Sequence, residues 1–203
     1  MLARLRWMIA TVSLFCVTPA FAQITEMNLY APADALAAWD VQTRLQWVDL
    51  PETLGLSYND VLASDLVTVR GFRHATAAEV ETLFLNAGFL TTDNVNDPLN
   101  DPAADLLLDV MGCTQFCGTV NELGRGFADY SPGWTVRPNY HSTALGSGAA
   151  VVSLFSSNFD LVDATAGHFL VRYIPPPQPG CGIGCELALV IPLLAGLRRW
   201  ARR

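Results

Sequence analysis

The amino-acid sequence predicts an α+β domain of short strands and two main helices, followed by a short C-terminal membrane helix. Three observations lead to this prediction. Short apolar runs separated by turn residues come first, two segments with helical spacing and capping residues follow, and glycine-rich, strand-like segments come last. Strands, then helices, then strands again are typical of the α+β class, whereas a regular alternation would predict a parallel sheet.

The segments before the two helices predict a hairpin, a short helix and a further strand. Residues 36–39 and 45–50 are short apolar runs on either side of residues 40–43, which is the pattern of a hairpin. Ser57 is a natural N-cap and predicts a short helix directly after it. Residues 67–72 predict another strand.

The first of the two main helices has clear ends. It should begin at a capping box, in which Thr76 and Glu79 each bond a backbone amide of the first turn. Gly88 can end it in a left-handed turn. Between these ends, apolar residues recur at helical spacing: Val80, Leu83, Phe84 and Ala87.

The second main helix is expected over residues 102–111. Asp101 is its expected cap, a proline occupies its first turn and Gly112 follows its end. Beyond it the chain predicts three strands, over residues 124–130, 149–155 and 169–174.

The N-terminus predicts export. Residues 1–22 begin with two arginines, continue with an apolar run and end in a small-x-small motif, which is the composition of a cleavable signal peptide. The alternative is a buried N-terminal helix, but the run is short and Pro19 interrupts it. We therefore expect the mature chain to begin at Gln23.

The C-terminus predicts a linker and a membrane tail. The extracytoplasmic domain, residues 23–175, is followed by a proline-rich linker over 176–180 and by an apolar tail over 181–203. We expect the protein in the cell envelope or outside the cell, anchored to the membrane at least transiently. The tail ends in four arginines that the positive-inside bias places in the cytoplasm: Arg198, Arg199, Arg202 and Arg203.

The charge of the domain excludes nucleic acid as a partner. Residues 23–175 hold 18 acidic residues against 6 arginines and no lysine, so their net charge is −12. A domain this acidic repels a phosphate backbone. The acidity can also serve only to keep an exported protein soluble.

Four cysteines outside the signal peptide form two close pairs. These are Cys113/Cys117 and Cys181/Cys185, and export permits disulfides in both. Zinc is the alternative, but no histidine lies beside either pair. Cys181 and Cys185 could also carry a lipid, since they lie at the start of the tail.

One loop is a candidate calcium site. Residues 93–101 are rich in the oxygen ligands that a hard cation prefers. The segment does not follow the EF-hand pattern, and loops rich in Asp and Asn also form because these side chains satisfy turn backbones. A plain loop and a calcium site both remain open, and calcium is the one cofactor considered. The candidate ligands are Asp93, Asn96, Asp97 and Asp101.

Trp134 is the candidate ligand-binding residue. It follows a Ser-Pro-Gly turn, where an indole ring could be exposed to stack on a sugar, whereas Trp47 shares a strand face with Leu45 and should be buried. No nucleophile elbow or metal-binding pair of histidines is present in the sequence. We therefore expect a protein that is not an enzyme, with a secreted hydrolase as a less favoured alternative.

The tail resembles the sorting signals of the PEP-CTERM class, which exosortase-type enzymes process. The resemblance lies in the proline-rich linker, the short apolar helix and the terminal arginines. Pro177, Gln178 and Pro179 stand where that class has Pro-Glu-Pro. The resemblance implies a sorting protease as a partner, and an unprocessed single-span anchor is the alternative.

The segment over residues 36–84, about a third of the mature domain, resembles exported proteins that carry such tails and, remotely, the C-terminal domain of Legionella collagen-like proteins. The likeness lies in a D-x-x-T-x-L-x-W strand at 40–47 and in Arg73, Thr76 and Glu79, whereas Phe72 replaces a tryptophan. It implies a fold that can be C-type-lectin-like. The expected function is non-catalytic interaction at the cell surface or extracellular matrix, and a lectin-like glycan-binding module is the alternative.

Overall fold

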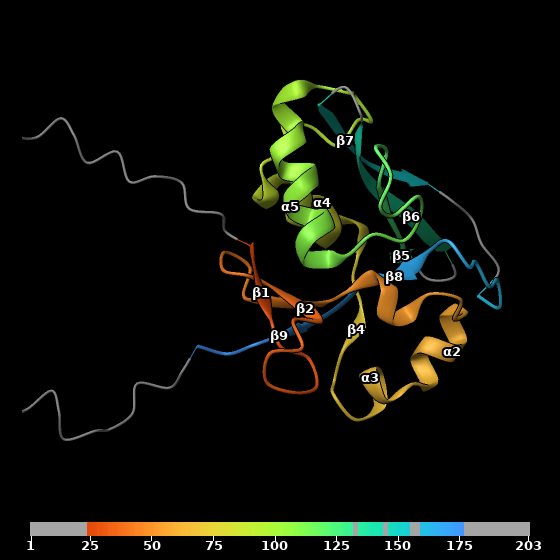
Figure 1. The fold of residues 1–203 in the computed structure, drawn as a ribbon. Coiled ribbons are helices and arrows are strands. Elements are labelled where there is room, and N and C mark those ends of the chain that lie inside the picture. The colour runs from red at the N-terminus through yellow and green to blue at the C-terminus, as the bar shows by residue number, and fades with distance from the viewer. Residues whose placement is uncertain (1–23, 132–133, 144–145, 155–158, 177–203) are drawn as a thin grey trace, which may run out of the picture. The chain divides into compact units, whose positions relative to one another are not determined.

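Two β-sheets and two long helices build the domain (Figure 1), which confirms the predicted α+β class. The computed structural model describes residues 24–131, 134–143, 146–154 and 159–176. Within these residues, no helix is long and apolar enough to cross a membrane. The signal peptide, the cysteines 181 and 185, the tripeptide 177–179 and the terminal arginines lie outside the described residues.

The first sheet joins the two ends of the domain. Its strand order is β1-β2-β3-β9-β4, and β2 and β3 form the predicted hairpin. The last strand returns to this hairpin, with Trp47 of β3 opposite Val171 of β9. The bounds are β1 Ile24–Met27, β2 Ala37–Asp40, β3 Leu45–Val48, β4 Arg73–His74 and β9 Leu170–Tyr173.

Three short helices follow the hairpin. They are η1 (Leu50–Thr53), α2 (Tyr58–Ala63) and α3 (Asp65–Thr68), and Ser57 caps α2 as predicted. The strand predicted over residues 67–72 is wrong, because α3 occupies its first half. An amphipathic strand would place Val67 and Val69 on one buried face, but Val69 is 76% exposed. Leu66 instead packs into a small core between these helices and the first sheet.

The two long helices, α4 (Ala77–Ala87) and α5 (Asp101–Met111), contact strands of both sheets and carry much of the main core. The capping box of α4 is present, and Gly88 ends the helix with a φ of 109°. The N-cap of α5 is Asn100 rather than the predicted Asp101. The reason is the 3₁₀ turn η2 (Pro98–Asn100), which leads directly into the helix.

The second sheet has the order β7-β6-β5-β8. Its strands are β5 (Leu123–Ser131), β6 (Trp134–Thr143), β7 (Ser147–Leu154) and β8 (Gly167–His168). Strand β6 was not predicted, because Pro138 and many polar residues weaken the strand pattern. Its buried Val136, Pro138 and Tyr140 nevertheless alternate with more exposed residues, as a strand with one buried face requires.

The pairing of Cys113 with Cys117 is confirmed. Their Cα atoms lie 5.6 Å apart and the sulfur atoms are bonded. The bond closes a small loop directly after α5. Such a short loop restricts few unfolded conformations, so its stabilisation should stay below the roughly 3 kcal/mol of a 15-residue loop.

Candidate binding pocket

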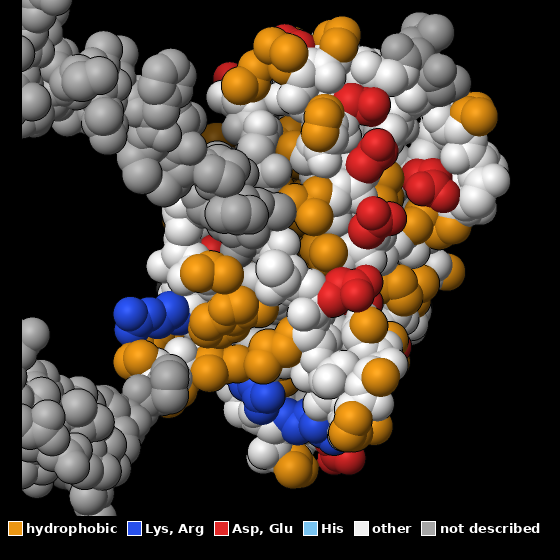
Figure 2. Space-filling model, turned by 60° about the vertical axis from the view of Figure 1, so that its left-hand side comes forward, with side chains coloured by type: hydrophobic (Ala, Val, Ile, Leu, Met, Phe, Trp, Pro, Cys, Tyr) orange, Lys and Arg blue, Asp and Glu red, His pale blue; other side chains and the backbone are white. Residues whose placement is uncertain are grey.

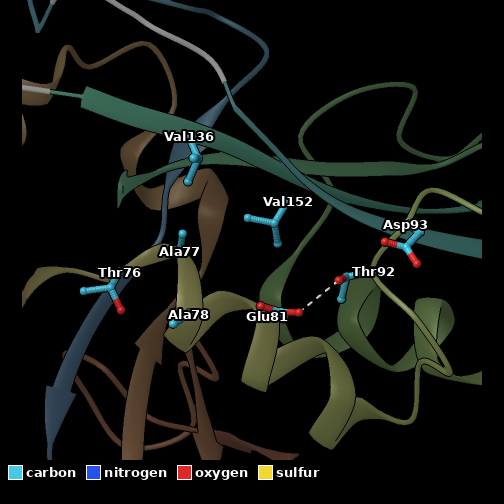
Figure 3. Close-up of a pocket in the computed structure, with 8 residues that line it drawn as sticks. All are labelled: Thr76, Ala77, Ala78, Glu81, Thr92, Asp93, Val136 and Val152. Atoms are coloured by element: carbon cyan, nitrogen blue, oxygen red, sulfur yellow. Dashed lines mark hydrogen bonds between the residues drawn. The ribbon is translucent and has the colours of Figure 1, made fainter. Parts of the chain in front are cut away.

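A cavity of about 520 Å³ opens where the first turns of α4 meet the loop after this helix and strands β6 and β7. This volume lies within the range of small-molecule sites. Figure 3 shows the residues that line it: Thr76, Ala77, Ala78, Glu81, Thr92, Asp93, Val136 and Val152.

The floor of this pocket is aliphatic. Val136 and Val152 come from the neighbouring strands β6 and β7, and both side chains point toward α4 (Figure 3). Ala77, at the start of α4, lies opposite them. Val136 itself is fully buried, so the apolar surface that a ligand can reach is provided by the partly exposed Ala77 and Val152.

The rim of the pocket is polar and acidic. The Thr92 hydroxyl donates to Glu81 Oε1 at 3.4 Å, and the Thr91 hydroxyl donates to Asp93 Oδ2 at 2.7 Å. Each carboxylate keeps its other oxygen without a hydrogen-bond partner among the described residues. The backbone of Asp93 forms a bridge with Val151, which holds the rim against the edge of β7.

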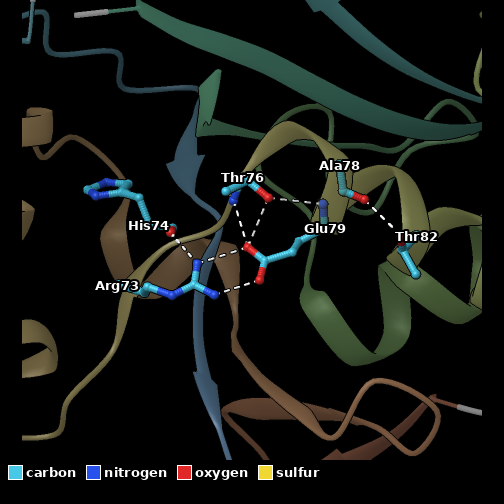
Figure 4. Close-up of polar contacts among 6 residues, drawn as sticks. All are labelled: Arg73, His74, Thr76, Ala78, Glu79 and Thr82. Carbon is cyan, nitrogen blue, oxygen red and sulfur yellow. Dashed lines mark hydrogen bonds and ion pairs between the residues drawn. The ribbon is translucent and has the colours of Figure 1, made fainter. Parts of the chain in front are cut away.

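An ion pair fixes the end of α4 that faces the pocket (Figure 4). The Arg73 guanidinium donates to both carboxylate oxygens of Glu79, at 2.8 and 2.5 Å, and also to the His74 carbonyl at 3.0 Å. Glu79 in turn accepts from the Thr76 backbone amide at 2.9 Å. The bond from Arg73 is the main cause that holds the pKa of Glu79 below its ordinary value. Thr76 is therefore held in place where it lines the pocket.

A second polar cluster is buried behind this network. His74 Nε2 lies 3.0 Å from His168 Nδ1, and His168 Nε2 lies 3.0 Å from the Leu56 carbonyl. A carbonyl only accepts, so His168 donates from Nε2 and accepts from His74 at Nδ1. His168 is then neutral. Burial lowers the pKa of His74 to about 3 and also lowers the pKa of His168.

Tyr58 completes this cluster. Its ring stacks on His74 with 3.9 Å between centroids, and its hydroxyl donates to Asp129 Oδ1 at 2.8 Å. Burial, reinforced by this bond, raises the pKa of Tyr58. The cluster joins α2, β4, β5 and β8, and neutral imidazoles in such surroundings are suited to packing rather than to proton transfer near neutral pH.

The four candidate calcium ligands have separate contacts. Asp93 lines the pocket, Asn96 Oδ1 lies 2.9 Å from His141 Nε2, and Asp97 Oδ1 accepts from the Leu99 amide at 2.8 Å. Asp101 Oδ1 accepts from the Ser142 hydroxyl at 3.0 Å. In the described part of the chain, no three His, Cys, Asp or Glu side chains are placed to hold a metal ion. Calcium at this loop stays a prediction.

Two tryptophans, Trp134 and Trp47, were considered for ligand binding. For Trp134 the structure describes only the backbone, at the start of β6. Trp47 is buried as expected and does not line the pocket. The sequence did not point to Thr76, Glu81, Val136 and Val152 as one site, because they come from three segments that only the fold brings together.

Comparison with known proteins finds no match to a family model, to a curated protein or to a solved structure. The pocket is therefore interpreted from its own chemistry.

Proposed function

We propose that this protein acts in the cell envelope by non-catalytic binding, and that a carbohydrate occupies the pocket between α4 and strands β6 and β7. The observation that carries the proposal is the combination of an aliphatic floor with carboxylate and hydroxyl groups on the rim. A sugar ring presents C–H groups on its faces and hydroxyls around its edge. Ala77 and Val152 suit the first. The oxygens of Glu81 and Asp93 that have no partner among the described residues can accept hydrogen bonds from the second.

A secreted hydrolase is the second candidate, because Glu81 and Asp93 are two carboxylates in one pocket. Glycoside hydrolysis uses such a pair, but one carboxyl must be kept protonated by its surroundings. Both side chains are exposed to solvent. Neither side chain therefore lies in the buried, apolar surroundings that a catalytic acid requires, which favours binding.

The lectin-like form of the fold belongs to the same proposal. The support is topological: β9 returns to the N-terminal hairpin, and both long helices and the second sheet lie in the chain between them. Fold alone does not carry function, so the pocket remains the stronger support.

The binding proposal is tested with the full chain and a panel of neutral, amino and acidic oligosaccharides, by calorimetry, with calcium and with a chelator. Val152→Arg fills the pocket and should abolish binding. The matched control is Val69→Arg, at an exposed position outside the pocket, and it should bind as the wild type does. Failure to bind any member of the panel, or binding that survives Val152→Arg, would contradict the proposal.

The same samples distinguish binding from hydrolysis. Release of reducing ends should stay at background. Turnover that is lost in Glu81→Gln would favour the hydrolase.

The proposed location rests on the two ends of the sequence. N-terminal sequencing of protein from the envelope fraction should begin at Gln23, and a chain that begins at Met1 would refute removal of the signal peptide. Processing of the tail predicts an intact mass without its terminal arginines. Retention of Arg203 would leave an ordinary single-span anchor.

A further inference from the structure

We propose that the pocket selects saccharides that carry a protonated amine, as amino sugars without an N-acetyl group do, over neutral and anionic ones. This inference rests on the proposed function of the same pocket. It concerns which sugar is preferred, and it can fail while sugar binding stands.

The two carboxylates on the rim come from different segments and leave room for a ligand between the helix and the loop. Glu81 belongs to the second turn of α4, and Asp93 belongs to the loop that follows this helix (Figure 3). Each has one oxygen that accepts from a threonine and one that has no partner in the described part of the chain. An ammonium group has three donors, so it can bond a carboxylate oxygen of the rim and neighbouring hydroxyls at the same time.

No cation competes for these two carboxylates within the described residues. Neither takes part in an ion pair, since the ion pairs there join Arg73 to Glu79 and Arg137 to Asp163. Glu81 and Asp93 are also the charged residues among those that line the pocket. Among the described residues that line it, the pocket therefore has two acidic side chains and no basic one.

The remainder of the domain reinforces this charge. On the face shown in Figure 2, acidic side chains form a row along the domain, and arginine side chains lie toward the lower end of the view. The net charge of −12 over residues 23–175 gives the surroundings the same sign. Uronic acids and phosphorylated sugars should accordingly be repelled, and cationic sugars attracted.

A sugar amine fits the pocket better than a bare metal ion does. No group of three metal-binding side chains exists among the described residues, and a divalent cation needs several ligands at short distance. The amine of an amino sugar is attached to a ring instead. The ring can pack on Ala77 and Val152 while its amine lies at the carboxylates.

The test compares two trisaccharides that differ only in the amine: the glucosamine trimer and the N-acetylglucosamine trimer. A galacturonic acid trimer serves as the anionic member. At pH 6, where the amine is protonated, the full chain should bind the glucosamine trimer about three- to tenfold more tightly than the acetylated one, and the anionic trimer most weakly. The preference should shrink as salt rises and should vanish at pH 9, where the amine is neutral.

Two double variants separate the pocket from the general acidity of the domain. The variant E81Q/D93N should equalise the affinities for the two glucosamine-type trimers. The control D105N/D109N removes the same charge from exposed positions on α5 that do not line the pocket, and it should keep the preference. If both double variants lost the preference for the glucosamine trimer to the same extent, the proposal would be overturned, because the overall charge of the domain would then explain that preference.

The failure of this inference differs from the failure of the proposed function. Equal affinity of the wild type for the two trimers would refute amine selectivity and leave carbohydrate binding intact. Absence of binding to all three trimers and to the wider panel, or binding that survives Val152→Arg, would refute carbohydrate binding in the pocket itself.

Discussion

At the scale of single residues, Asp49 is a buried carboxyl group with a strongly raised pKa. It is 9% exposed, and its Oδ1 atom is buried without a hydrogen-bond partner in the described part of the chain. It does not cap η1 although it stands at the N-cap position. Burial, and then the negative charges of Glu52, Glu26 and Asp34, raise its pKa to about 7. The folded protein therefore holds a proton here that an unfolded chain releases.

We predict that Asp49 makes the protein less stable as pH rises from about 4 to about 7. In this window the unfolded state has lost the proton and the folded state has kept it. The contribution of Asp49 to the free energy of unfolding therefore falls by up to about 1.4 kcal/mol per pH unit. Asp49→Asn mimics the protonated form and removes the effect. The measurement is the free energy of unfolding in urea for both proteins at several pH values. The prediction would be contradicted if the difference in the free energy of unfolding between the wild type and the variant did not change with pH.

His74 should have the opposite effect. Its pKa falls from 6.5 in the unfolded chain to about 3 in the folded protein, so stability is lost as pH drops from about 6.5 toward 3. His74→Phe keeps the stack on Tyr58 and removes the titrating ring. The same series of urea experiments should show a variant that is less sensitive to acid by up to about 1.4 kcal/mol per pH unit. At pH 8 the variant should lose about 1 kcal/mol with the bond to His168.

At the scale of elements, α4 shows how local chemistry positions the pocket. Its capping box satisfies two backbone amides, and Arg73 holds the Glu79 carboxylate that forms half of the box. The first turn of the helix supplies Thr76, Ala77 and Ala78 to the lining. A shift of the residue at which this helix begins would therefore move one side of the pocket.

We predict that Thr76→Ala destabilises the protein by about 1 kcal/mol, because an amide at the start of α4 loses its acceptor. Thr76→Ser is the matched control, since it keeps the hydroxyl, and it should stay within a few tenths of a kcal/mol of the wild type. Both are measured by urea unfolding at pH 7. Equal losses in the two variants would show that the methyl group rather than the cap is responsible.

The pairing of β5 with β8 depends on glycine. Gly126 and Gly167 lie opposite each other, and a Cβ at Gly167 would stand 2.1 Å from the Leu50 carbonyl oxygen of η1. Gly167→Ala must therefore displace η1 or β8 and should destabilise by about 3 kcal/mol or more. Gly118→Ala has open space and a φ of +74°, so it should cost only about 1–2 kcal/mol of backbone strain. Thermal unfolding of both variants checks the difference.

At the scale of the whole molecule, the last strand completes the first sheet. Strand β9 lies between β3 and β4, and its Leu170 and Val171 are fully buried. Arg172 connects distant parts of the chain, since it donates to Gln46 Oε1 at 2.6 Å and to the Arg70 carbonyl at 3.0 Å. The domain therefore depends on residues near its own C-terminal end.

We predict that a chain that ends at Phe169 does not fold, because β3 and β4 lose their common neighbour. A chain that ends at Pro176 keeps every described strand and helix and should unfold cooperatively. Circular dichroism and thermal melting compare the two truncations. A cooperative transition in the shorter chain would show that the sheet does not need β9.

Much of the local structure could be predicted, whereas the candidate site could not. The helix caps at Ser57 and Thr76 and the turn between β2 and β3 lie within a few residues of the groups they bond. The strand predicted over residues 67–72 is wrong because so short a run of apolar residues fits both a strand and a helical turn. The structure has the helix, in which Leu66 is buried. The sequence pointed to Asp93 as a candidate calcium ligand, but it did not point to the other residues that line the pocket.

The sequence by itself determined the class of the fold and both ends of α4, and it favoured the disulfide between Cys113 and Cys117, since each depends on residues close together in the chain. Only the tertiary structure decided the place of β6, the pairing of His74 with a residue 94 positions away, and the pocket beside α4. These features join side chains from segments that share no local pattern. Their positions follow from how both sheets pack on the helices, which is a property of the whole core.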